Sequence, residues 1–243
     1  MKKNIRSLKF SDFEKIIEKI EEPTYRAKQI YRWLWKKNVH SFKEMKNISK
    51  RCREYLINNF TITHAKISTQ IKSKDGTIKF LFCLEDGSKC EGVLIPEKNR
   101  VTACISSQVG CSFACKFCAT GNMKRKRNIM SYEILDQVNL MMDKSYKEFN
   151  MGITNIVYMG MGEPLVNYQN VIDSINYLTS KEALNMSSKR ITVSTVGVSK
   201  MIKKLADEKL KVNLAVSLHS ANNLKRSEIM DINNSNDLES LKE

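Results

Sequence analysis

The chain of 243 residues is 42% hydrophobic, enough to bury the core of one large domain or of a small domain followed by a larger one. With only 9 glycines and 3 prolines, the composition excludes a disordered or fibrous chain. A net charge of +15 indicates either a polyanionic partner such as nucleic acid or a well-solvated surface, and the charge alone favours neither.

Neither a secretory leader nor a membrane span is predicted. The first ten residues, MKKNIRSLKF, are basic but lead into SDFEKIIEKI, which is not an apolar segment. No apolar run approaches the length that crosses a bilayer. We therefore expect a cytoplasmic chain whose 7 cysteines serve metal binding or thiol chemistry rather than a disulfide framework.

Residues 1–60 are predicted to form a small basic helical accessory domain that binds RNA. They hold 16 Lys and Arg residues against 7 Asp and Glu residues, a net charge of +9. Apolar residues at helical spacing predict three helices, over residues 11–22, 23–37 and 49–60. Ser11 and Glu14 match a capping box for the first of them.

Two tryptophans in the second helix, Trp33 and Trp35, cannot both lie on one helical face. We expect one ring to pack in the core and the other against the next domain. The alternative is that a ring stacks on RNA bases.

Residues 61–99 are predicted to be a β-meander that links two domains. Ile78, Phe80, Phe82 and Leu84 alternate with other residues, which is the period of a strand, and a second strand follows up to residue 95. Asp-Gly turns at residues 75–76 and 86–87 bound the first of these strands.

Residues 100–243 alternate between strands and amphipathic helices, which predicts parallel βα units. The strands are expected over residues 100–107, 153–160, 190–197 and 211–220. The helix after the first strand is expected to be capped by Ser131, with Glu133 in its first turn. The predicted fold class is α/β with a partial (βα) barrel, whose active site would lie at the carboxyl ends of the strands.

Three cysteines follow the first of these strands at a compact spacing, Cys111-x3-Cys115-x2-Cys118. A structural zinc site normally uses four ligands in two separated pairs, although Cys104 could serve as a fourth ligand here. An iron–sulfur cubane held by three thiolates would keep one iron open. Such an iron can bind a ligand with a free amine and carboxylate, such as S-adenosylmethionine (SAM), and start radical chemistry.

This spacing is the radical-SAM signature, and the wider sequence resembles the RlmN/Cfr family of RNA methyltransferases. The resemblance rests on CISSQVGCSFACKFCATG, MGMGEPLVN, RITVSTVGV and AVSLHS, and also on the N-terminal RAKQIYRWLWKK. It implies that the three cysteines bind a [4Fe-4S] cluster. It also implies contacts to SAM from a further set of residues: Gly162, Glu163, Ser194, Ser217, Leu218 and His219.

The resemblance further implies a catalytic role for two residues outside the cysteine triplet. Cys104 would help to remove a proton from the adenine and take part in a transient disulfide, and Glu91 would be a candidate proton acceptor. The implied reaction uses one SAM to methylate a protein cysteine and a second to generate a radical on that methyl group. The implied product is methylated at carbon 2 of an adenosine in 23S ribosomal RNA and in transfer RNA.

The family also implies a low-potential electron donor such as flavodoxin, no membrane partner and a monomeric state. Its methyl-carrying cysteine lies near the C-terminus, and this sequence has no counterpart, because Cys52, Cys83 and Cys90 precede the predicted barrel. We therefore expect a chain truncated at the C-terminus, either a fragment or inactive. The alternatives are methylation of carbon 8, as in Cfr, and a non-catalytic zinc- or RNA-binding module.

Overall fold

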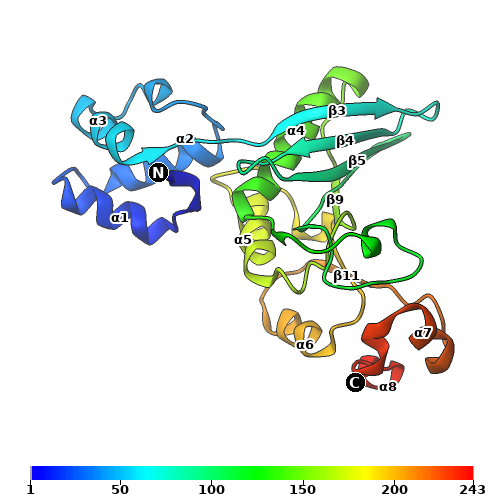
Figure 1. Cartoon of the computed structure of the whole chain (residues 1–243). Helices are drawn as coiled ribbons and strands as arrows, with labels where there is room; N and C mark the ends of the chain where they lie inside the picture. The colour runs from blue at the N-terminus through cyan, green and yellow to red at the C-terminus, as the bar shows by residue number, and fades with distance from the viewer. Residues whose placement is uncertain (1, 243) are drawn as a thin grey trace. The chain divides into compact units, whose positions relative to one another are not determined.

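The computed structural model describes residues 2–242, which form two compact units. The first unit comprises residues 2–64 and 176–186, and the second comprises residues 65–175 and 187–242. Each unit has a hydrophobic core of its own. Figure 1 traces the chain through both.

The N-terminal unit is built on the three helices expected from the sequence. They are α1 (Phe10–Lys19), α2 (Tyr25–Trp35) and α3 (Lys50–Asn59), with short 3-10 turns η1 (Ile5–Ser7) and η2 (Phe42–Glu44). Strands β1 (Lys3–Asn4) and β2 (Phe60–Thr61) pair in parallel. The apolar faces meet in the core through buried side chains such as Phe13, Ile30 and Leu56.

The spacing leaves the roles of the two tryptophans open, and the structure assigns them. Trp35 is only 6% exposed and stacks on Tyr177, with ring centroids 4.4 Å apart. Trp33 is partly exposed, and its indole Nε1 donates a hydrogen bond to Asn47. The expectation that one of the two rings packs in the core is therefore confirmed, and that ring is Trp35.

Two predicted helix caps are wrong in the same way. The capping box at Ser11 and Glu14 does not form, because α1 begins at Phe10 and the Asp12 carboxylate accepts the Lys9 backbone N–H at 2.9 Å. Ser131 is the first residue of its helix rather than the cap. In both helices an acidic residue in the first turn satisfies an N–H group that the helix itself leaves unpaired.

One seven-stranded sheet dominates the second unit, in the order β11-β10-β9-β6-β5-β4-β3. Its antiparallel half is formed by β3 (Lys66–Lys72), β4 (Ile78–Cys83) and β5 (Lys89–Glu97). Its parallel half is formed by β6 (Arg100–Cys104), β9 (Asn155–Tyr158), β10 (Ile191–Thr195) and β11 (Asn213–Val216). The predicted meander is thus not a separate linker, because β5 pairs with β6.

Helices connect the parallel strands in the predicted βα order. They are α4 (Ser131–Phe149), α5 (Tyr168–Thr179), α6 (Ser199–Asp207) and α7 (Asn223–Ile229), followed by η5 (Asp231–Asn234) and α8 (Leu238–Lys242). Helix α4 packs on β5 and β6 (Figure 1). Short elements complete the unit: β7 (Gln108–Val109), β8 (Arg127–Asn128), η3 (Ala119–Asn122) and η4 (Ser188–Arg190).

The strand register separates the two faces of this sheet. Cys90, Leu94, Ala103 and Ile156 are fully buried on the face that the helices cover. The opposite face is less buried, since residues there alternate with the core positions along each strand. The register places these side chains on that second face: Glu91, Val93, Cys104, Val157, Ser194 and Ala215.

None of the helices formed by residues 2–242 combines the length and the apolar character needed to cross a membrane.

Candidate functional site

A cavity of about 260 Å³ opens at the carboxyl ends of the parallel strands. It is lined by residues that the sequence assigns to the site: Cys111, Cys115, Cys118, Gly162, Glu163, Ser194 and Ser217. Phe117, Met159 and Val196 add apolar walls. Four sequence segments thus converge on one place, as a βα architecture requires of its strand ends.

The cysteine loop, residues 105–130, folds back on itself so that all three thiols reach this cavity. The Cys118 N–H donates to the Cys115 carbonyl at 3.0 Å, which forms a tight turn. The Phe113 N–H donates to the Cys111 Sγ at 3.4 Å, a contact of the kind that tunes cluster thiolates. Burial raises the pKa of Cys115 to about 11, and the charges of Cys111 and Cys118 add to this effect.

The geometry fits a cluster better than a single ion. Across residues 2–242, no three His, Cys, Asp or Glu side chains lie close enough together to hold one metal ion. The thiolates of a cubane each bind a different iron, so its ligands stand farther apart than the ligands of one ion. Three thiols around one cavity, with further room in it, match that arrangement.

The GMGEP loop after β9 is fixed against the start of the cysteine loop. Gly162 has φ +92°, and a Cβ there would lie 2.4 Å from the Cβ of Gln108, so only glycine fits. The Gln108 side chain accepts the Glu163 N–H at 3.0 Å. Gln108 is fully buried and was not singled out by the sequence.

Glu163 is the buried carboxylate of the cavity, only 2% exposed. Its oxygens accept the N–H groups of Leu165 at 3.0 Å and Val196 at 2.8 Å. Burial raises the pKa of Glu163, and these hydrogen bonds oppose that shift. The side chain therefore joins the end of β9 to the end of β10 and keeps a polar group at the wall of the cavity.

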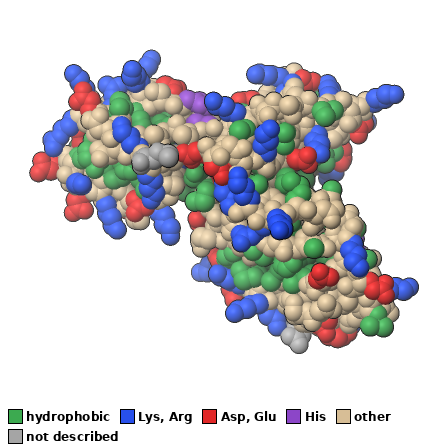
Figure 2. Space-filling model, in the orientation of Figure 1, with side chains coloured by type: hydrophobic (Ala, Val, Ile, Leu, Met, Phe, Trp, Pro, Cys, Tyr) green, Lys and Arg blue, Asp and Glu red, His purple; other side chains and the backbone are tan. Residues whose placement is uncertain are grey.

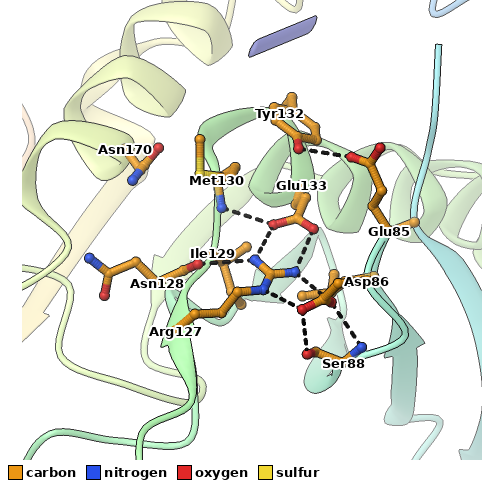
Figure 3. Close-up of polar contacts among 12 residues, drawn as sticks. Glu85, Asp86, Ser88, Arg127, Asn128, Ile129, Met130, Tyr132, Glu133 and Asn170 are labelled. Carbon is orange, nitrogen blue, oxygen red and sulfur yellow. Dashed lines mark hydrogen bonds and ion pairs between the residues drawn. The ribbon is translucent and has the colours of Figure 1, made fainter. Parts of the chain in front are cut away.

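An ion-pair cluster that the sequence did not reveal holds the far end of the cysteine loop (Figure 3). Arg127 donates to both carboxylate oxygens of Glu133, at 2.7 and 2.8 Å, and to both of Asp86, at 2.9 Å. Glu133 is buried in the first turn of α4, and Asp86 lies in the β4–β5 turn. The Arg127 guanidinium holds the pKa of Asp86 far below its usual range. The loop is thus tied to two rigid elements by bidentate contacts.

The remaining residues assigned to the SAM pocket lie at or beside its rim. Leu218 and His219 are exposed and do not line the cavity itself, and the His219 ring lies 3.7 Å from the ring of Phe117, which does. His219 has φ +56°, a left-handed conformation that few non-glycine residues adopt. Arg226, fully buried, donates to the carbonyls of Leu218 and Val196.

Cys104 and Glu91 lie outside the cavity lining but share a face of the sheet with Ser194. They come from neighbouring strands. Cys104 on β6 pairs with Val93 on β5, and Glu91 lies two residues before Val93 on the same strand. Glu91 forms an ion pair with Lys79 at 2.8 Å. The two catalytic candidates therefore lie on one face of the sheet. Ser194, which lines the cavity, lies on the same face.

Cys104 is expected to react slowly with iodoacetamide near neutral pH. Burial raises its pKa from an ordinary value of 9.0 to about 11. Its thiolate fraction at about pH 8 is then roughly 100-fold below that of an ordinary thiol, and labelling should accelerate roughly tenfold per pH unit between about pH 7 and 9. Mass spectrometry after timed labelling of the metal-free protein measures this, with urea-unfolded protein as the control. Equal labelling rates of Cys104 in the native and unfolded proteins would contradict the raised pKa of its thiol.

Two family models match the chain. The Ribosomal RNA large subunit methyltransferase N-terminal domain matches residues 3–62. The Radical SAM superfamily matches residues 105–242, more than half of the chain. Radical SAM methyltransferases use a [4Fe-4S] cluster and SAM, which agrees with the three thiols around one cavity.

Curated relatives are similar along the whole chain. A "Probable dual-specificity RNA methyltransferase RlmN" of Cytophaga hutchinsonii is 54% identical, and one of Christiangramia forsetii is 50% identical. These alignments cover 100% of this chain but 66% and 69% of the relatives, so the chain spans about two thirds of their length. A solved radical SAM methyltransferase from Sphaerobacter thermophilus matches 99% of this chain and 70% of its own, with a TM-score of 0.88 and 35% identity. The chain therefore belongs to the RlmN family of radical SAM RNA methyltransferases.

Proposed function

We propose that this chain forms the cluster- and SAM-binding part of an enzyme that methylates carbon 2 of an adenosine in 23S ribosomal RNA and in transfer RNA. The observation that carries the proposal is the single cavity shared by three cysteines, Glu163 and Ser194. The RNA methyltransferase names of the relatives and the ribosomal RNA large subunit methyltransferase name of the matched N-terminal domain support RNA as the substrate class. A low-potential protein such as flavodoxin would donate electrons in the cytoplasm.

Cys111, Cys115 and Cys118 would hold the cluster, and the other residues that line the cavity would bind SAM. When bound, the cluster supplies the low-potential electron that starts radical chemistry on SAM. The chain's own task is to position SAM and exclude water. Gly162 lets the loop turn tightly, Glu163 offers a buried carboxylate, and Phe117 and Met159 cover the apolar side.

Cys104 and Glu91 would act on the adenine from the same face of the sheet. The raised pKa keeps Cys104 protonated at neutral pH, so the adenine proton would not be taken by a preformed thiolate. The Glu91 carboxylate is paired with Lys79, and its partial exposure leaves it accessible to a substrate. Both residues are positioned by backbone pairing of β5 with β4 and β6 rather than by loops.

The test incubates the protein, expressed from its natural gene and loaded with iron and sulfide, with SAM, a reductant and a fragment of 23S ribosomal RNA. Mass spectrometry of the digested RNA should show 2-methyladenosine, and a Cys104→Ala variant should lose it. A product methylated at carbon 8 would favour the Cfr-type reaction instead. Cleavage of SAM to 5′-deoxyadenosine without any methylated adenosine would contradict the proposed substrate.

A further inference from the structure

A basic groove surrounds the indole of Trp33 in the N-terminal unit. It encloses about 530 Å³, within the size range of ligand-binding pockets. Its walls bring together one aromatic ring, four cations and two amides, from Gln29, Arg32, Trp33, Lys36, Lys37, Lys46 and Asn47. No Asp or Glu lines it, although acidic side chains are interspersed with basic ones elsewhere on this unit (Figure 2).

The Trp33 ring is held in a fixed orientation and still reaches solvent. Its Nε1 donates to the Asn47 side chain, and Arg26 donates to the backbone carbonyl of Asn47. Gln29 in turn accepts a hydrogen bond from Arg26 at 2.7 Å. Because the hydrogen bond holds its polar edge, the Trp33 ring can present its face to a ligand in the groove. Trp35 on the same helix is instead buried in the core.

Most of the charge in the groove is uncompensated. Arg32 forms an ion pair with Glu182. Lys36, Lys37 and Lys46 form no ion pair with any residue between 2 and 242, and the Lys37 Nζ lies 5.7 Å from the Trp33 ring centroid. Three like charges around one cavity repel one another, so an anion bound among them would relieve that repulsion.

We propose that this groove binds a single-stranded segment of the RNA substrate, with one unpaired base stacked on Trp33 and the flanking phosphates against Lys36, Lys37 and Lys46. The inference rests on the proposed function, which supplies RNA as the partner. An aromatic face beside a row of cations is the arrangement that binds single strands without reading their sequence. A duplex would present its phosphates but no free base face to the ring.

The test measures binding of a fluorescent single-stranded RNA of about twelve nucleotides to the whole chain by anisotropy. Trp33→Ala should weaken binding about 5- to 150-fold, and Trp33→Phe should retain most of it, because stacking needs only an aromatic face. Lys36→Ala/Lys37→Ala should lower the slope of log affinity against log salt by about 1.4. Thermal unfolding followed by circular dichroism checks that each variant is folded.

Matched controls lie on the same unit outside the groove. Phe10 is 40% exposed at the start of α1, so Phe10→Ala removes an exposed aromatic ring from the same unit, and Lys15→Ala/Lys19→Ala removes two exposed charges from α1. Both controls should bind like the parent chain.

Three outcomes would overturn the proposal: unchanged binding in the Trp33 and lysine variants, equal loss in the controls, or equal competition by a polyglutamate of the same charge. None of these results would change the expected outcome of the methylation assay, which tests the proposed function. Conversely, RNA binding that depends on Trp33 would survive a failure of that assay, so the two proposals fail separately.

Discussion

Replacing Cys115 with alanine is expected to abolish cluster binding. Cys115 is the most buried of the three thiols that line the cavity, and two remaining ligands cannot hold a cubane that normally takes four thiolates. Iron and sulfide content after anaerobic reconstitution should fall from near one cluster per chain to background, and the brown colour should be lost. SAM cleavage should be lost with it.

The control for this variant is Cys83→Ala. Cys83 is also a free, partly buried cysteine, but it lies on β4 and does not line the cavity. The control should keep full iron and sulfide. A Cys115→Ala protein that also kept them would show that other cysteines bind the cluster, and a colourless protein holding zinc would favour the non-catalytic module.

The order of strands and helices could be predicted because the two kinds of element carry different hydrophobic periods. The parallel strands β6, β9, β10 and β11 lie within the predicted segments, each followed by its predicted helix. Helix starts were less predictable. Ser11 and Ser131 are good caps by residue type, yet Ser11 is the second residue of its helix and Ser131 is the first. The neighbouring acidic side chains provide the capping instead.

Sequence motifs predict the cysteines, Gly162, Glu163 and the two serines that line the cavity, but they do not predict the residues that support it. Arg127 and Asp86 are 41 positions apart, and each resembles an ordinary solvated charge in the sequence. Gln108 is one polar residue among several in SSQVG. Their roles depend on which segments the fold brings together, and periodicity within one element carries no information about that.

Arg226 is the clearest case of a supporting residue, because it lies on the short helix α7, and nothing in the sequence of that helix marks this arginine as buried. In the structure it is fully buried, and its guanidinium donates to the carbonyls of Val196 at 2.7 Å, Leu218 at 3.2 Å and Asn236 at 3.3 Å, and to the side chain of Asn233. No carboxylate among residues 2–242 pairs with it. Burial accordingly lowers its pKa, while the charge of Cys115 opposes that shift.

Replacing Arg226 with methionine is therefore expected to destabilise the sheet edge and weaken SAM binding together. The carbonyls at the ends of β10 and β11 would lose their donor, and each buried unsatisfied group costs about 1–3 kcal/mol. We expect a loss of about 3–5 kcal/mol in the free energy of unfolding, and at least about tenfold in SAM affinity. Arg226→Lys should recover little, since one ammonium cannot reach acceptors on three segments.

Urea unfolding, amide hydrogen exchange in β10 and β11, and calorimetric SAM binding to the reconstituted protein measure these effects. Lys225→Met is the matched control, because Lys225 is the exposed neighbour on α7 and its loss removes the same charge. Exchange should accelerate in β10 and β11 before it does in β4, which lies toward the other edge of the sheet. If Arg226→Met unfolded at the same urea concentration as Lys225→Met and bound SAM equally well, the buried guanidinium would not be what joins these strand ends.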